Sequence, residues 1–182
     1  LAEDPEAVLE DVVQLDDGRL VALRSRHAVS EVTVDGAALE LPGLGTVDGL
    51  SGHPEGGSEL WLGWTDTTSP PRVLRFDGRT GALTLWEDAP GRADPPAVHA
   101  QLIEVTSADN TIVRAQVLSP VAAPDRPRPT VLYGYGGFAV PLTPAYTATA
   151  LAWVAAGGVW VVANLRGGSE EGEAWHRDGM RG

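Results

Sequence analysis

The sequence has no cysteine and no lysine, so all 13 basic residues are arginine. Without cysteine, disulfides, thiolate-ligated metals and a cysteine nucleophile are excluded, and four histidines are the remaining soft ligands. Acidic residues number 25 and the net charge is −12, which argues against nucleic acid as a partner because phosphates attract cationic surfaces. Long apolar runs are missing too: residues 148–163 are broken by Gly157 and Gly158, and neither half could span a bilayer, so no membrane partner is expected.

The remaining composition is that of a globular protein, with 43% hydrophobic and 21% charged residues. Absence of cysteine suits a cytoplasmic location, which we expect, leaving open a signal peptide upstream of Leu1. The chain starts at Leu1 rather than methionine and stops at Gly182 without a tail-like composition. We interpret both ends as cut points within a longer polypeptide.

The first half alternates short apolar segments with turn signals. Strands are predicted at residues 19–24, 31–34, 37–41, 59–63, 73–76 and 82–86. Leu20 and Leu60 lie 40 residues apart, and the turn dipeptides Asp35–Gly36 and Asp77–Gly78 lie 42 apart. This period matches the about 40–50 residues of a propeller blade. The pattern therefore predicts about two β-propeller blades, with a β-meander of coincidental spacing as an equally weighted alternative.

Proline, glycine and charged residues crowd residues 88–96, which makes this stretch the predicted domain boundary. We divide the chain into residues 1–91 and 92–182. The second part opens with a predicted hairpin formed by residues 99–104 and 111–118.

A βαβ unit is predicted next. Residues 130–133 form a short strand that runs into the glycine loop Gly134–Gly137. Thr143 is the predicted N-cap of a helix and Pro144 its first residue, and the alanine-rich residues 145–156 continue it. Residues 159–165 are apolar almost throughout, which is typical of a strand buried on both faces of a parallel sheet.

The glycine loop has several possible uses. Residues 134–139 fit the dinucleotide pattern G-x-G-x-x-A, but prolines delay the helix and no acidic residue occurs between 138 and 169 to bind a ribose. No cofactor is therefore expected. Such a loop at a strand end can instead supply an oxyanion donor in an α/β-hydrolase. A tight turn beside core aromatics, namely Tyr133, Tyr135 and Phe138, fits equally well.

No catalytic nucleophile can be identified. The elbow G-x-S-x-G is absent: Ser169 follows two glycines, but Glu171 occupies the second glycine position. The histidines share no metal-ligand spacing, so no metal is expected, and His176 beside Trp175 is interpreted as structural. The cluster Glu170, Glu171 and Glu173 is interpreted as solvated carboxylates at a helix start rather than acid/base or metal-binding groups.

Three segments closely resemble the start of the catalytic domain of prolyl oligopeptidases: PTVLYGYGGF (129–138), LTPAY (142–146) and GGVWVVANLRGGSEEGEAWHRDGM (157–180). A weaker likeness extends upstream. TSADNTIVRAQVLSP resembles the first hairpin of that domain, and WTDTTSPPRVLRFD resembles the end of the family's propeller. Two positions depart from the pattern, with Ser169 where glycine is usual and Glu171 where an aromatic is common.

The resemblance implies an α+β chain in two parts, the end of a β-propeller (about two blades) followed by the start of an α/β-hydrolase domain. It implies a serine-type endopeptidase that hydrolyses short proline-containing peptides on the carboxyl side of proline. Tyr135 matches the family tyrosine that donates to the oxyanion, and Phe138 matches the aromatic that lines the proline pocket. The catalytic Ser, Asp and His would lie outside these residues, so the piece alone is expected to be inactive and to need the rest of the polypeptide.

Two alternatives stay open. Oligopeptidase B and acylaminoacyl peptidase are relatives of the same kind, although Gly137–Phe138 argues against them. A non-catalytic scaffold that kept the propeller edge and the βαβ unit is the second alternative.

Overall fold

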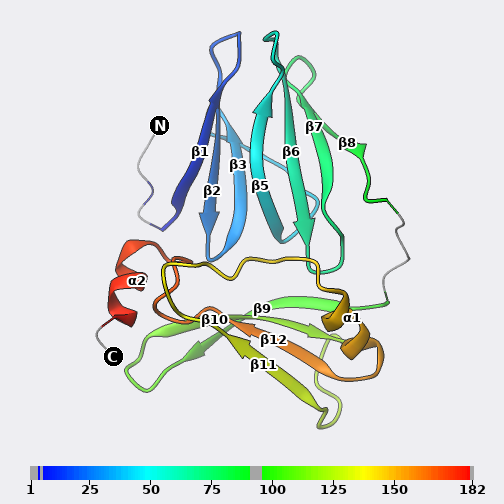
Figure 1. Cartoon of the computed structure of the whole chain (residues 1–182), viewed down its shortest axis with the longest axis vertical. Coiled ribbons are helices and arrows are strands. Elements are labelled where there is room, and N and C mark those ends of the chain that lie inside the picture. The colour runs from blue at the N-terminus through cyan, green and yellow to red at the C-terminus, as the bar shows by residue number, and fades with distance from the viewer. Residues whose placement is uncertain (1–3, 5, 91–95, 181–182) are drawn as a thin grey trace.

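The computed structural model describes residues 4, 6–90 and 96–180 of the chain, and in these it has twelve strands and two short helices. The strands form three separate four-stranded sheets (Figure 1). The predicted boundary between residues 91 and 92 lies outside the described residues. Neither helix of the described part is long and apolar enough to cross a membrane.

The first two sheets repeat one architecture, an antiparallel meander whose strands are hydrogen-bonded in chain order. The first sheet consists of β1 (Val8–Gln14), β2 (Leu20–Arg26), β3 (Val29–Val34) and β4 (Ala37–Leu39). The second consists of β5 (Gly45–Gly52), β6 (Glu59–Asp66), β7 (Arg72–Asp77) and β8 (Ala82–Glu87). They stand side by side in Figure 1.

The predicted repeat is present. Leu20 and Leu60 lie in the second strands of their sheets, and each Asp–Gly dipeptide lies at the end of the third strand. Asp35 and Gly36 both have positive φ, 49° and 83°, as a two-residue hairpin turn requires. Two blade-like units of this kind fit the expected propeller part.

The first strand of each unit was missed by sequence reasoning. Both β1 and β5 carry a register shift, between Leu9 and Asp11 and between Val47 and Gly49, which disrupts the alternation of apolar residues. β5 also contains three glycines. A weakened period-two pattern and low β-propensity hide these strands.

One apolar core joins the two sheets. Its buried residues are Leu15, Val21, Leu23, Val32, Val47, Leu60, Leu62, Trp64, Leu74 and Phe76. Trp64, which is 1% exposed, packs over Gly45, where a Cβ would lie 2.5 Å from the indole ring. Glycine at this strand position therefore allows the largest side chain of the core to fit.

The third sheet is mixed, in the order β11-β12-β10-β9. β9 (His99–Thr106) and β10 (Ile112–Ser119) form the predicted hairpin, and β10 pairs antiparallel with β12 (Val159–Ala163). β11 (Thr130–Gly134) pairs parallel with β12, and α1 (Ala148–Ala155) connects them. α2 (Glu173–Gly179) follows. The parallel pair confirms the expected strand–helix–strand order.

Two local predictions in this unit were wrong. The helix begins at Ala148 with Thr147 as N-cap, rather than at Pro144 after Thr143. Residues before it are held extended: the Thr46 hydroxyl donates to the Pro144 carbonyl (2.7 Å), and the Tyr146 N–H donates to Thr65 Oγ1 (3.4 Å). Tertiary contacts with the second sheet thus override the local start signal.

The second error concerns the burial of β12, which was expected to be covered on both faces. All five of its residues are only partly buried. α1 covers part of the sheet through Ala150 and Val154, which pack near Leu118 and Trp160. No other described helix packs on β12, so its apolar sequence is not matched by full burial in this chain.

Candidate active-site loop

The loop after β11 is the feature that sequence reasoning singled out. Gly137, Phe138, Ala139 and Val140 form a two-residue turn closed by a hydrogen bond from the Val140 N–H to the Gly137 carbonyl (3.0 Å). Phe138 and Ala139 have φ of 53° and 54°, the left-handed region that non-glycine residues rarely adopt. Such residues cost on the order of 1–3 kcal/mol each and persist only where the surroundings hold them.

The aromatic residues of this region lie at the surface. Tyr133 and Tyr135 are each 48% exposed and Phe138 is 86% exposed. The alternative in which they are core aromatics beside a tight turn is therefore wrong for the described chain. Tyr135 and Phe138 lie in the loop that follows β11. In Figure 1 the segment between β11 and α1 runs between the third sheet and the first two.

The segment after β12, at Gly167, contacts the backbone of this loop. The Ala139 N–H donates to the Gly167 carbonyl at 2.9 Å. A Cβ on Gly167, whose φ is 103°, would collide with the carbonyl of Gly136. Glycine at 167 therefore lets the segment after β12 approach the backbone of the Tyr135 loop directly.

Leu142, at the far end of the loop, is held by buried polar side chains. Its N–H donates to Glu170 Oε1 (2.9 Å), and its carbonyl accepts from Asn164 Nδ2 (2.8 Å) and Gln116 Nε2 (3.4 Å). Glu170 is 2% exposed and Asn164 is 1% exposed. The interpretation of Glu170 as a solvated carboxylate was wrong. The side chain is buried and accepts a hydrogen bond from the Leu142 N–H.

Glu171 was also expected in solvent and instead connects two sheets. Its Oε2 lies 2.8 Å from His27 Nδ1, in the turn between β2 and β3, and its Oε1 accepts from Arg114 Nη1 at 2.7 Å. Arg114 also pairs with Glu104 at 2.9 Å. Only Glu173, whose side chain is 72% exposed, fits the expected solvated helix start.

We expect Glu171→Gln to loosen the contact between the first sheet and the third. The variant loses the charge on an acceptor shared by Arg114 and His27, and hydrogen bonds to charged groups contribute about 1.5–3 kcal/mol each. Chemical denaturation of the full-length protein should show a lower free energy of unfolding. That free energy should also depend less on salt, because the variant lacks one charge of a partly exposed ion pair that salt screens. Glu173→Gln is the matched control and should change neither. An unchanged midpoint for Glu171→Gln would contradict the expectation.

The remaining charged and aromatic groups near the loop are structural. His176 Nδ1 lies 2.8 Å from the Gly167 carbonyl, and Trp175 Nε1 donates to the Leu165 carbonyl at 3.0 Å, in agreement with the structural interpretation of His176. Hydrogen bonds from Ser107, the Thr111 N–H and Arg166 hold the pKa of Asp109 well below its usual value. These contacts tie the β9–β10 turn to the end of β12.

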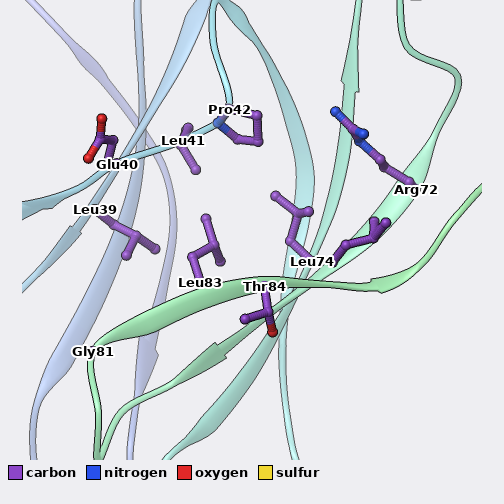
Figure 2. Close-up of a pocket in the computed structure, with 10 residues that line it drawn as sticks. Leu39, Glu40, Leu41, Pro42, Arg72, Leu74, Gly81, Leu83 and Thr84 are labelled. Atoms are coloured by element: carbon purple, nitrogen blue, oxygen red, sulfur yellow. The ribbon is translucent and has the colours of Figure 1, made fainter.

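Two hollows of the described chain are large enough for a small ligand. One, of about 430 Å³, lies on the third sheet beside the loop and is lined mainly by apolar groups, among them Tyr133, Leu142 and Trp160. The other, of about 600 Å³, lies between β4 and β8. Figure 2 shows its leucines pointing into a common space, with Glu40 and Arg72 farther out. The described residues contain no cluster of three or more His, Asp or Glu that could hold a metal.

Sequence reasoning left out Asn164 and interpreted Glu170 and Glu171 as solvated. A signal was present for Asn164, because it is a polar residue at the end of an apolar strand. For Glu170 the signal was the glycine pair before it, since a Cβ on Gly168 would collide with the Glu170 carboxylate. Neither signal indicates which backbone group the side chain binds.

Comparison with known proteins gives consistent results. No family model matches the chain. It is 31% identical over 144 residues to a prolyl endopeptidase of Elizabethkingia miricola, covering 79% of this chain and 20% of that protein. It is 28% identical over 192 residues to a prolyl oligopeptidase of Omphalotus olearius, covering 99% of this chain and 26% of that one. The chain thus spans about a fifth to a quarter of the length of these relatives.

Solved structures agree in fold. One from an analysis of two prolyl endopeptidases superposes with a TM-score of 0.84 at 33% identity and covers 98% of this chain and 27% of its own. Prolyl oligopeptidase B of Galerina marginata, at 22% identity, gives a TM-score of 0.83 over 98% of this chain and 26% of its own, which is evidence of fold alone. Sequence and fold together show that the chain belongs to the prolyl oligopeptidase family.

Proposed function

We propose that the full-length protein is a serine-type endopeptidase that hydrolyses short peptides on the carboxyl side of proline. The observation that carries the proposal is the loop at the carboxyl end of β11, in which the side chains of Tyr135 and Phe138 are both exposed. Acyl transfer from a peptide needs hydrogen-bond donors where the tetrahedral oxyanion develops. A phenol held on a rigid loop is such a donor.

The two aromatic side chains are assigned different roles. The Tyr135 hydroxyl donates a hydrogen bond to the oxyanion, which becomes stronger as charge develops on that oxygen. The Phe138 ring, 86% exposed, offers an apolar face to the pyrrolidine of the substrate proline. The strain of the left-handed turn is consistent with a functional site, because such strain is concentrated where geometry matters.

The proposal includes the domain division. Residues 92–182 are the start of an α/β-hydrolase domain, supported by the parallel β11–β12 pair joined through α1. Residues 1–91 are two blades of a propeller, and the rest of the polypeptide completes both domains. The nucleophile, acid and histidine come from that remainder, because no G-x-S-x-G occurs in these residues.

A substrate panel tests the proposal. The full-length protein should cleave a fluorogenic peptide with proline before the scissile bond, and a serine-reactive fluorophosphonate should abolish the activity. Peptides with arginine in that position and N-acetylated amino-acid substrates are the controls, and both should be cleaved far more slowly. Preference for arginine would indicate an oligopeptidase B, preference for the acetylated substrate an acylaminoacyl peptidase, and no turnover a scaffold. The 182-residue chain alone should hydrolyse none of them.

A further inference from the structure

The turn that carries Phe138 needs support from outside, since both of its central residues are in the left-handed region. Two sets of hydrogen bonds, both C-terminal to Phe138, supply that support. Ala139 donates to the Gly167 carbonyl, and three residues later both backbone groups of Leu142 are bound by side chains. Pro141 stiffens the piece between them, because proline fixes its own φ and restricts the preceding residue. A shift of Leu142 would therefore move the turn as well.

The set of hydrogen bonds at Leu142 is unusual in its chemistry. A carboxylate and an amide, 2% and 1% exposed, make the contacts, and within the described residues Glu170 Oε2 and Asn164 Oδ1 are buried without a hydrogen-bond partner. Buried polar atoms without partners cost about 1–3 kcal/mol each. The pair accepts this cost while satisfying both backbone groups of Leu142, so it fixes the position of this stretch of backbone.

We infer that Glu170, together with Asn164, is a positioning residue for the oxyanion-donating tyrosine. By binding the Leu142 backbone, Glu170 fixes the position of the turn that carries Phe138. The position of this turn then fixes that of the Tyr135 hydroxyl. Glu170 itself does not touch substrate, and it transfers no proton. The inference rests on the proposed role of Tyr135. It assigns to this buried carboxylate a task beyond satisfying the Leu142 N–H.

The test uses proline-peptide hydrolysis by the full-length protein. Glu170→Ala should lower kcat by about 10–100-fold with little change in KM, because a displacement of about 1 Å of a catalytic group has an effect of this size. Glu170→Gln keeps an oxygen acceptor for the Leu142 N–H and should retain most of kcat. Glu173→Gln, an exposed glutamate of the same segment, is the matched control and should behave as wild type.

A double-mutant cycle separates positioning from a general structural effect. In a Tyr135→Phe background, Glu170→Ala should lower kcat little further, because the group that it positions is already gone. A full additional loss in that background, or an unchanged kcat for Glu170→Ala alone, would overturn the inference and leave the role of Tyr135 intact. Full activity of Tyr135→Phe would instead overturn the proposed role of Tyr135, and the inference with it.

If circular dichroism shows that Glu170→Ala does not fold, Gly168→Ala takes its place. Its methyl group would displace the Glu170 carboxylate without removing the side chain. A lower kcat with unchanged KM would then support the inference, and a folded variant with full kcat would refute it.

Discussion

Replacing Tyr135 with phenylalanine in the full-length protein is expected to lower kcat for proline peptides by about 100-fold, close to 3 kcal/mol of transition-state stabilisation. The variant keeps the ring, its packing against Gly137 and the exposed position of the side chain, and loses only the hydroxyl. Because the oxyanion exists only in the transition state and the intermediate, KM should change little. Steady-state kinetics on a fluorogenic proline peptide measures both constants.

Tyr133→Phe is the matched control for this experiment. Tyr133 is also 48% exposed, but it lies within β11 and lines the apolar hollow rather than the loop. We expect its loss of a hydroxyl to leave kcat near the wild-type value. Equal losses for the two variants would show that hydroxyl removal acts through the sheet, and an unchanged rate for Tyr135→Phe would remove Tyr135 from the mechanism.

The second large effect is on stability. Trp64→Ala should reduce the free energy of unfolding of the two-sheet unit by about 3–5 kcal/mol, the usual cost of truncating a buried aromatic side chain. Trp64 is 1% exposed, contacts the core shared by both sheets and packs over Gly45, so the cavity could not close without moving backbone. Urea denaturation of the full-length protein, followed by tryptophan fluorescence and circular dichroism, would measure the loss.

Trp86→Ala serves as the comparison, since Trp86 lies on β8 of the same sheet and is 57% exposed in the described chain. It contacts Trp61 edge-on, with ring centroids 5.8 Å apart, and lies beneath the Arg75 guanidinium. These contacts contribute about 0.5–1.5 kcal/mol, so a smaller loss is expected. A loss for Trp64→Ala no greater than that for Trp86→Ala would contradict the core assignment.

Predictions from sequence succeeded where a short segment carries its own signal. Asp35–Gly36 needs positive φ and forms a turn almost wherever it occurs, and the hairpin about Ser107–Asn110 is equally local. They failed where a partner distant in sequence decides. The start signal at Thr143–Pro144 is locally sound, yet Thr46 and Thr65 bind this segment in an extended form.

The same distinction applies to the site. Tyr135 and Phe138 were assigned because PTVLYGYGGF resembles the start of the catalytic domain of prolyl oligopeptidases, and their roles stay predictions until kinetics tests them. The buried state of Glu170 was missed because a carboxylate in a glycine-rich segment favours solvent on local grounds. Only its distance to the Leu142 N–H, 28 residues earlier in the chain, reverses that expectation.

By itself the sequence determined that the chain has no cysteine chemistry, a net charge of −12 and the composition of a globular protein, and the spacing of its turns indicated a repeated strand unit. These properties are sums or periods along the chain, so no folded structure is needed to read them. The tertiary structure alone decided which polar groups are buried, where α1 begins and how the Tyr135 loop is held. Each of these depends on hydrogen bonds between residues far apart in sequence. The packing of the sheets determines which residues form these bonds.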